Sequence, residues 1–427
     1  MSADAWSHGL WEHTASPAPA TSVLDTDVTA DVLVVGAGFT GTSATLHLAE
    51  AGAKVAVLEA ESIGFGGSGR NVGLVNAGMW MMPDDVEAGL GPHFGPRLLR
   101  LLSEAPGQVF ELIAKHGIAC DLTRNGNLHC AVGASGMREI RERARQWLAR
   151  GAPVQLLDAA ETARTVGTTA YEGALLDKRT GMLQPLSYVR GVAHAAIRAG
   201  AKIFTQSPAI AAHDDGNIWE VRTDRGRIHA NWIVVATEAY THSVWPEIRA
   251  ELVHLPYFNV ATKPLDNALS RTILPDQRGV GDTKKVLSSF RVDPQRRLVF
   301  GGVGSISGAG GATQVAWARR AIHRIFPQLK EVEFEYQWGG SIGLTADNLP
   351  RFHAPGRNVV SISGYNGRGI AAGTVFGRLL ARRILGQIND NDVPLPLTAA
   401  RSFPFRSVRE SFYDFGSRLV HFAIDRY

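Results

Sequence analysis

Three glycines and one carboxylate near the start of the chain are spaced as a phosphate and ribose site requires. Gly36, Gly38 and Gly41 form G-x-G-x-x-G, and Glu59 follows at the usual distance of about 20 residues. The first glycine permits a tight turn, the second lets a pyrophosphate approach the backbone, and the third allows close packing of helix and strand. A carboxylate at the later position can accept hydrogen bonds from ribose hydroxyls. These residues together predict a dinucleotide site.

The elements that must position these residues are present in the right order. The stretch from Asp31 to Glu59 reads as an apolar strand, a glycine turn, a helix and a second strand. A helix that starts at such a turn directs unpaired N–H groups and its positive dipole end at phosphates. Phe39 and Thr40 open this helix, and Ala60 follows the carboxylate, so we expect all three beside the nucleotide. A βαβ unit without a nucleotide is the alternative. The absence of Arg or Lys after Glu59 argues against NADP, whereas NAD and FAD both remain open here.

Length and composition limit the remaining classes. A chain of 427 residues suggests two packed domains, and a charged fraction of 20% with a net charge of +4 describes an ordinary globular protein. No basic stripe with interleaved aromatic residues is present, so nucleic acid is not an expected partner. Cys120 and Cys130 form no C-x-x-C motif and no metal-type cluster. We therefore expect no metal, reduced thiols and a cytoplasmic location.

Neither a signal peptide nor a membrane span is expected. The N-terminus lacks a basic segment followed by an apolar one, and no apolar run approaches the roughly 18 residues that a span requires. Residues 405–427 mix aromatic residues with arginine, and we expect them to pack on their own protein rather than on a membrane.

A second glycine-rich stretch follows the nucleotide motif. Residues 62–74 contain five glycines, too many for a stable helix or strand interior. Such a loop beside a nucleotide fold typically presents backbone to a ligand, and a mobile surface loop is the alternative. Near the C-terminus, the apolar run 359–363 precedes a glycine turn and an expected helix over 371–386. This is the same order of strand, glycine turn and helix as at residues 31–59, but without the G-x-G-x-x-G spacing.

The rest of the chain alternates between helix and strand patterns. Residues 94–118 look helical, with Pro106 and Gly107 expected to divide them into two helices. Further helices are expected at 136–150, 186–199 and 314–326. Strands are expected at 128–132, 202–205, 219–223, 227–228, 232–236, 257–262, 286–291, 298–301 and 331–338.

Four motifs give the chain a family resemblance: Leu10–Ala15 (LWEHTA), Gly67–Gly73 (GSGRNVG), Val234–Tyr240 (VVATEAY) and Gly364–Thr374 (GYNGRGIAAGT). Over nearly the whole chain they resemble the FAD-dependent amine and amino-acid oxidases, the family of D-amino acid oxidase, glycine oxidase and sarcosine oxidase. The branch that contains gamma-glutamylputrescine oxidoreductase is the most similar. The resemblance implies FAD rather than NAD, in agreement with the single complete fingerprint. The later Gly302-Val-Gly304 lacks the third glycine and the acid.

The resemblance implies an α/β fold with a Rossmann-like FAD-binding domain and a second α+β substrate domain on a mixed or antiparallel sheet. It places an arm at 1–30, the FAD-binding domain at 31–80, 151–250 and 338–400, the substrate domain at 81–150 and 251–337, and a tail at 401–427. The flavin contacts that it implies are Ser68, Gly69, Arg70, Asn71, Gly73, Leu74, Ala209, Ala236, Thr237, Gly340, Gly364, Asn366, Gly367, Arg368, Gly369 and Ile370.

Two departures from sarcosine oxidases affect the expected site. Gly340 stands near the position of their flavin-linked cysteine, so we expect noncovalent FAD. Ala77 and Ala371 stand where their Arg and Lys hold a carboxylate, so another group must bind the substrate.

The resemblance implies oxidation of a small amine. Hydride leaves the carbon beside nitrogen for flavin N5, the imine hydrolyses, and molecular oxygen reoxidises the flavin. We expect a carboxylated amine or amino acid, such as an N-substituted glycine, iminodiacetate or gamma-glutamylputrescine. The candidates for the substrate face are His254, Tyr257, Arg291, Tyr365 and Arg368.

Each candidate also has a purely structural interpretation, as a strand aromatic, a core histidine or a surface arginine. Three other functions remain open: a dehydrogenase of the same fold that passes electrons to a quinone or a protein, a flavin-dependent RNA-modifying enzyme, and a binding protein without turnover.

Overall fold

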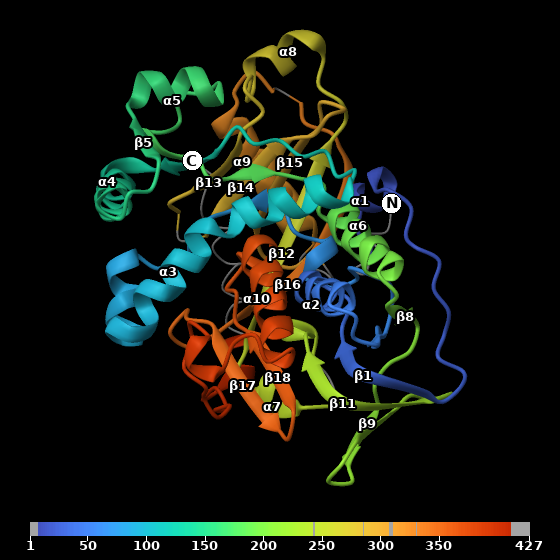
Figure 1. Ribbon diagram of the computed structural model, residues 1–427. Helices are drawn as coiled ribbons and strands as arrows, with labels where there is room; N and C mark the ends of the chain where they lie inside the picture. The colour runs from blue at the N-terminus through green and yellow to red at the C-terminus, as the bar shows by residue number, and fades with distance from the viewer. Residues whose placement is uncertain (1–6, 242–243, 285, 307–310, 330, 411–427) are drawn as a thin grey trace.

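Two eight-stranded sheets organise the chain (Figure 1). The computed structural model describes residues 7–241, 244–284, 286–306, 311–329 and 331–410. In the view of Figure 1 the first sheet occupies the lower half and the second sheet the upper half, with the long helix α3 (Pro83–His116) crossing between them. The family fold expected from the motifs, a Rossmann-like sheet with a second α+β unit, is confirmed.

The first sheet is the nucleotide-fold sheet, in the order β17-β18-β11-β1-β2-β8. The five strands from β18 to β8 in this order run parallel. Parallel strands need crossover connections, which cover both faces of the sheet. The apolar run of β1 is accordingly buried throughout its second half. A β9–β10 hairpin extends from β11. The strands are β1 (Val28–Val35), β2 (Val55–Leu58), β8 (Lys202–Phe204), β9 (Ala211–Asp214), β10 (Trp219–Arg222), β11 (Arg227–Val235), β17 (Arg351–Gly356) and β18 (Val359–Ser363).

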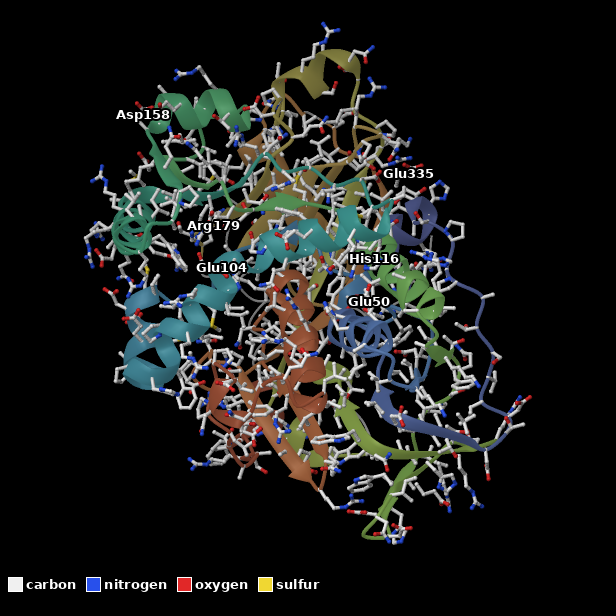
Figure 2. The ribbon with its side chains drawn as sticks, viewed as in Figure 1. Glu50, Glu104, His116, Asp158, Arg179 and Glu335 are labelled. Carbon is white, nitrogen blue, oxygen red and sulfur yellow. The ribbon has the colours of Figure 1, made fainter. Side chains whose placement is uncertain are left out.

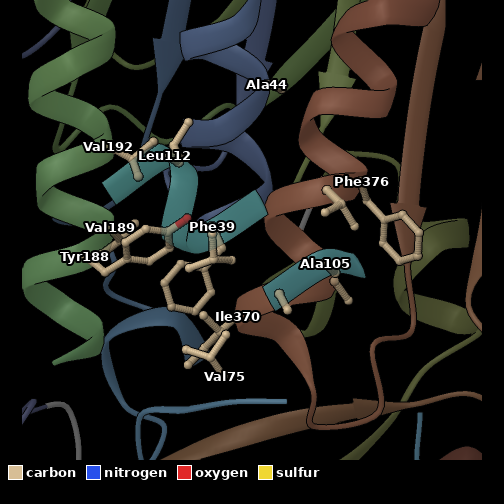
Figure 3. Close-up of a cluster of buried hydrophobic side chains, with 14 of the residues drawn as sticks. Phe39, Ala44, Val75, Ala105, Leu112, Tyr188, Val189, Val192, Ile370 and Phe376 are labelled. Carbon is tan, nitrogen blue, oxygen red and sulfur yellow. The ribbon is translucent and has the colours of Figure 1, made fainter. Parts of the chain in front are cut away.

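Helices α2 (Phe39–Glu50) and α10 (Gly369–Ile384) pack closely beside each other. Close approach is possible because Gly377 has no side chain: a Cβ there would lie 2.4 Å from the Thr40 carbonyl oxygen. Helix α6 (Pro185–Arg198) covers the other side of α2. Figure 3 shows the resulting core, in which Phe39, Tyr188 and Ile370 meet from three elements far apart in sequence.

The second sheet has the order β16-β12-β15-β14-β13-β4-β6-β5 and is mixed, because β13 and β4 are parallel whereas the other pairs are antiparallel. Helix α9 (Gly311–Ile325) covers it with an aromatic core of Phe290, Phe300 and Trp317. Its strands are β4 (Asn127–Ala131), β5 (Val154–Leu157), β6 (Gly173–Asp177), β12 (Val253–Thr262), β13 (Gly279–Asp282), β14 (Ser288–Val292), β15 (Leu298–Val303) and β16 (Phe334–Leu344).

Further helices and a separate two-stranded sheet of β3 and β7 complete the fold. They are α1 (Leu10–Thr14), β3 (Leu74–Val75), α4 (Gly133–Ala149), α5 (Ala159–Val166), β7 (Gly181–Met182), α7 (Pro246–Ala250) and α8 (Asn267–Thr272), with short 3-10 turns at Gly67–Gly69, Glu238–Tyr240 and Asp390–Asp392. Figure 2 shows Glu50 and His116 close together where the end of α2 faces the end of α3. His116 Nε2 lies 3.5 Å and Lys115 Nζ 2.7 Å from Glu50 Oε1.

Sheet pairing departs from the expected segment boundaries in two places. Strands β5 and β6 lie in 151–250, which we assigned to the FAD-binding domain, yet they pair beside β4 in the second sheet. Strand β16 crosses the expected boundary at 337 and pairs with β12 along its whole length. These pairings are long-range, so neither was visible in local patterns.

The expected break at Pro106 is wrong. Helix α3 continues through it, and the one residue with non-helical dihedrals is Gly91, at φ 72°. A proline cannot donate to the carbonyl four residues earlier, but here the Leu102 carbonyl accepts from Gly78 N at 3.0 Å instead. A tertiary hydrogen bond thus compensates for the missing helical one.

The structure describes the expected N-terminal arm from residue 7 and the expected C-terminal tail up to residue 410. The arm contains the short helix α1, whose Leu10 and Trp11 are buried. Residues 227–228 and 232–236, expected as separate strands, form the single strand β11. Residues 411–427 of the expected tail lie outside the described part of the chain.

Within the described part, no helix has the length and apolar character to cross a membrane, and no cluster of three metal-ligating side chains is found.

Candidate functional site

A cavity of about 1680 Å³ lies between the two sheets. Its wall joins the turns that follow β1, β11 and β18 to residues of β4, β12 and β14. Pockets for single small ligands are usually roughly 300–1,000 Å³. The cavity therefore has room for a dinucleotide together with a second small molecule.

Glu59 stands at one end of this cavity, after β2. Its Oε2 accepts from Ala37 N at 2.7 Å and its Oε1 from Glu61 N at 3.0 Å. Burial raises the pKa of Glu59, and these two backbone hydrogen bonds partly oppose the rise. A carboxylate has about four acceptor sites, so capacity for two ribose hydroxyls remains.

The first glycine turn meets the requirements of a pyrophosphate site. Gly36 has φ 102° and ends β1, and a Cβ on Gly41 would lie 1.8 Å from the Gly36 oxygen. Helix α2 then begins after Gly38, which offers no capping side chain. Ser68 Oγ accepts from Phe39 N at 3.0 Å, which leaves the other first-turn N–H groups directed at the cavity. The turn fits a bound diphosphate.

The glycine-rich loop lies against the same cavity, and three side chains donate hydrogen bonds to its backbone carbonyls. Trp11 Nε1 donates to the Asn71 carbonyl at 2.8 Å, while Trp338 Nε1 and Asn259 Nδ2 donate to the Arg70 carbonyl at 3.0 and 2.8 Å. Helix α1 thus fixes the loop that faces the cavity. This explains the N-terminal motif, whose purpose the sequence left open.

The C-terminal glycine turn closes the opposite wall. Asn366 Oδ1 accepts from Thr345 N at 3.0 Å, and Tyr365 OH lies 2.6 Å from Thr40 Oγ1. Glu238 approaches the turn from the end of β11. Burial raises the pKa of Glu238 to about 7, against opposing hydrogen bonds from the backbone of Ala239, Gly364 and Tyr365.

Most of the expected cofactor residues line the cavity. Gly41, Gly69, Gly73 and Gly364 are not among its lining residues and instead allow close packing; a Cβ on Gly73, for example, would lie 2.3 Å from the Leu183 oxygen. The expected residues that do line it are Gly36, Gly38, Phe39, Thr40, Glu59, Ala60, Ser68, Arg70, Asn71, Leu74, Ala209, Ala236, Thr237, Gly340, Asn366, Gly367, Arg368, Gly369 and Ile370.

Four of the five substrate-face candidates also line the cavity: His254, Tyr257, Tyr365 and Arg368. Tyr257 OH lies 2.6 Å from Ser289 Oγ, and burial raises the pKa of this phenol, so it stays protonated. Burial and then the neighbouring Arg249 lower the pKa of His254, so this imidazole is neutral at pH 7.

Arg291 departs from its expected place. It is almost fully buried outside the cavity lining, donates from Nη1 to the Leu183 carbonyl, and its Cζ lies 5.7 Å from the centre of the Trp11 ring. Arg291 is two residues after Ser289 on β14 and so shares its face of the strand, but it lies further along the strand, against Leu183 and Trp11. Its contacts are those of a core arginine.

The sequence did not reveal a cationic end of the cavity, formed around Arg368. The Arg368 Cζ lies 4.4 Å from the centre of the Trp80 ring, and Nη1 donates to the Ala77 carbonyl at 2.8 Å. Burial, and then Arg143, lower the pKa of Arg368 to about 9. Burial, Arg143 and Arg368 together lower the pKa of His129 to about 3. This end therefore carries positive charge from arginine beside a neutral imidazole, which suits an anionic group.

One signal in the sequence could have found Arg143. Ile140, Ala144 and Trp147 follow the helical spacing of a buried face on α4, and Arg143 lies within that face. An arginine in an apolar stripe needs partners for its charge. Trp80 carried no such signal, because it lies in a connection without periodicity.

Comparison with known proteins agrees with this geometry. The model of a family described as FAD dependent oxidoreductase matches residues 31–383. Gamma-glutamylputrescine oxidoreductase of Escherichia coli is 32% identical to the chain over 96% of the chain and 100% of that protein.

Solved structures with the same fold are more distant in sequence. Glycine oxidase from Geobacillus kaustophilus matches with a TM-score of 0.73 and 20% identity, covering 88% of this chain and 100% of that one. Iminodiacetate oxidase from Chelativorans sp. matches with a TM-score of 0.67 and 19% identity, covering 86% and 100%. At these identities the structures support the fold alone.

Proposed function

Because the chain belongs to the FAD-dependent oxidoreductase family and acts on amines or amino acids, we propose that its substrate is a small amine bearing at least one carboxylate. The single observation that carries this proposal is Arg368. Its guanidinium lines the cavity and donates from Nη1 to the Ala77 carbonyl, and no hydrogen bond from Nη2 is found among the described residues. An arginine with donors to spare in a water-poor site is suited to a carboxylate.

The names of the relatives agree with an amine that also carries a carboxylate. Gamma-glutamylputrescine, glycine and iminodiacetate each combine these two groups. A secondary amine such as an N-substituted glycine, iminodiacetate or gamma-glutamylputrescine is our preferred substrate class.

FAD would be held noncovalently by the residues of the first sheet. Glu59 would accept the ribose hydroxyls, and the turn at Gly36 and Gly38 with the start of α2 would receive the pyrophosphate. The glycine-rich loop and the turn from Gly364 to Ile370 would border the flavin ring. The first sheet is thus the proposed FAD-binding part, and the second sheet the proposed substrate part.

When bound, FAD supplies the oxidant that takes hydride from the carbon beside the amine nitrogen. The protein's own residues orient the substrate. Arg368 would bind the carboxylate, and Trp80 and His129 would wall the cavity against water. Tyr257, protonated and hydrogen-bonded to Ser289, would present a polar contact from β12. His254 lines the cavity as a neutral imidazole and would supply a further polar contact.

The test is an anaerobic screen of purified holoenzyme against carboxylated and neutral amines, following bleaching of the flavin absorption. We expect carboxylated amines to bleach it and matched neutral alkylamines to do so far more slowly. Equal rates for both classes would contradict the proposal.

Molecular oxygen is the proposed electron acceptor. Oxygen consumption with the substrate found in the screen would support it. Flavin bleaching and dye reduction without oxygen consumption would instead identify a dehydrogenase that uses a quinone or a protein acceptor. We further propose a cytoplasmic location, in keeping with two buried free cysteines.

A further inference from the structure

We propose that Arg143 is a positioning residue for substrate recognition: it holds Trp80 against Arg368, so that Arg368 meets the substrate carboxylate in one orientation. This inference rests on the proposed function, because it takes Arg368 as the carboxylate partner. It adds a residue on helix α4, outside the nucleotide fold, to the recognition site.

The contacts of Arg143 are directed at one short segment of backbone. Nη2 donates to the Trp80 carbonyl at 2.6 Å, and Nη1 reaches the carbonyls of Met81 and Met79 at 3.2 and 3.4 Å. One buried guanidinium therefore binds three consecutive carbonyls. Its nearest carboxylate, Glu139, is 3.5 Å away and half exposed. The strongest of these contacts goes to the residue that carries the indole.

The backbone around Trp80 is hydrogen-bonded to neighbouring elements at both ends, and Arg143 binds the carbonyls in its middle. At the first end, Gly78 N donates to the Leu102 carbonyl at 3.0 Å, and the Ala77 carbonyl accepts from Arg368. At the other end, Asp84 N donates to Gln146 Oε1 at 2.9 Å. Between these ties the residues 79–81 have no regular secondary structure. The three carbonyls bound by Arg143 thus determine where the Trp80 side chain points.

Trp80 in turn determines the plane of the Arg368 guanidinium. The guanidinium lies over the indole face, 4.4 Å from its centre, while the His129 ring packs edge-on against the same indole at 6.1 Å. With one face covered by the indole and Nη1 held by Ala77, the guanidinium can present its remaining Nη donors in few directions. Two-pronged recognition of a carboxylate requires such a fixed plane.

A different role for Arg143 would be simple charge attraction of an anionic substrate. The two roles predict different behaviour for lysine, which keeps the charge but cannot bind three carbonyls in a fork. They also predict different coupling to Trp80, because long-range attraction does not pass through the indole.

The experiment measures binding of acetate, a minimal carboxylate, to the holoenzyme through the change in the flavin absorption spectrum. The variants are Arg143→Met, Arg143→Lys, Trp80→Ala and the Arg143→Met/Trp80→Ala double variant. The matched control is Arg141→Met, an exposed arginine on the same helix with no bond found among the described residues. FAD content and thermal unfolding are recorded for each.

We expect Arg143→Met and Trp80→Ala each to weaken acetate binding about tenfold to thirtyfold, the range of a desolvated cation–π contact. The double variant should be no weaker than the worse single variant, because both changes remove the same arrangement. Arg143→Lys should fall between the parent and Arg143→Met, and Arg141→Met should match the parent. FAD content should be unchanged throughout.

Additive losses in the double variant, or parent-like binding by Arg143→Lys, would overturn the positioning role. If Arg143→Met does not fold, Arg143→Lys and Trp80→Phe provide the same comparison. If the parent does not bind acetate, the carboxylate site and this inference both fail. If acetate binds as expected but no amine bleaches the flavin, the proposed oxidation fails and the positioning role stands.

Discussion

Thr40 Oγ1 lies 2.6 Å from Tyr365 OH and joins the two glycine turns of the site. The Tyr365 hydroxyl donates its only proton to the Ile362 carbonyl at 2.7 Å, so Thr40 is the donor of the shared bond. Thr40 belongs to the first turn of α2, and Tyr365 precedes α10. The bond therefore sets the distance between the proposed pyrophosphate turn and the proposed flavin-ring turn.

Replacing Tyr365 by Phe should lower the free energy of unfolding of the holoenzyme by about 1–3 kcal/mol, because two hydrogen bonds are lost and the buried Thr40 hydroxyl keeps no partner on this side. Denaturant unfolding at saturating FAD measures this. Thr40→Ser, which keeps the hydroxyl, should stay within a few tenths of the parent. Stability unaffected by Tyr365→Phe would show that the bond contributes nothing.

Replacing Glu59 by Ala should weaken FAD binding by about tenfold to a hundredfold. A hydrogen bond to a charged group contributes roughly 1.5–3 kcal/mol, and the substitution also frees Ala37 N from its partner. The measurement is the dissociation constant of FAD for the apoprotein. Glu61→Ala removes a neighbouring exposed carboxylate and is the control. Equal constants for Glu59→Ala and the parent would rule out the ribose role.

Glu238 should make the apoprotein less stable as pH rises. Burial raises its pKa from 4.5 to about 7, so between these values the folded state binds more protons than the unfolded state, and the free energy of unfolding falls with pH. The penalty is absent below 4.5 and complete above about 7. Unfolding of the apoprotein and of Glu238→Gln across this window tests it: the difference between them should grow in favour of Glu238→Gln as pH rises. A constant difference would contradict the buried carboxylate.

The flavin should be released by acid. Gly340, which the family resemblance puts near the flavin-linked cysteine of sarcosine oxidases, lines the cavity. Neither Cys120 nor Cys130 is among the lining residues described. Acid precipitation of purified yellow protein should leave FAD in the supernatant. Flavin that stays with the pellet would indicate a covalent bond.

Arg368 and Arg291 should respond differently to replacement by lysine. Arg368→Lys keeps the charge at the cavity but loses the two-pronged geometry, so KM for a carboxylated amine should rise about tenfold or more while FAD content holds. Arg291→Lys should leave KM unchanged and lower the melting temperature, because Arg291 is a core residue bound to the Leu183 carbonyl. A raised KM for Arg291→Lys with an unchanged KM for Arg368→Lys would instead identify Arg291 as the residue that binds the substrate.

Local patterns predicted much of the nucleotide end of the site. The glycine spacing and the acid after β2 are set within one βαβ unit, where turn chemistry and strand periodicity act over a few residues. Helices α6 and α10 accordingly begin and end within two residues of their expected bounds, whereas strand β1 begins at Val28, three residues before the expected stretch. The family resemblance added the FAD assignment, which the family match confirms.

Local patterns failed where a distant partner decided the outcome. Pro106 reads as a helix break, but Gly78 supplies the hydrogen bond to Leu102 that proline cannot. Arg291 reads as a strand arginine, but its contacts with the distant residues Leu183 and Trp11 bury it in the core. Strands β5 and β6 could have extended either sheet, and pairing with β4 placed them in the second.

The sequence by itself thus determined the nucleotide turn, the acid, the glycine-rich loops and the family, because each is a short-range arrangement of particular residue types. Only the tertiary structure decided that Trp80, Arg143 and Arg368 meet at one end of the cavity. These residues come from a connection, a helix and a glycine turn. No local propensity encodes their meeting, because it depends on how the two sheets pack around the space between them.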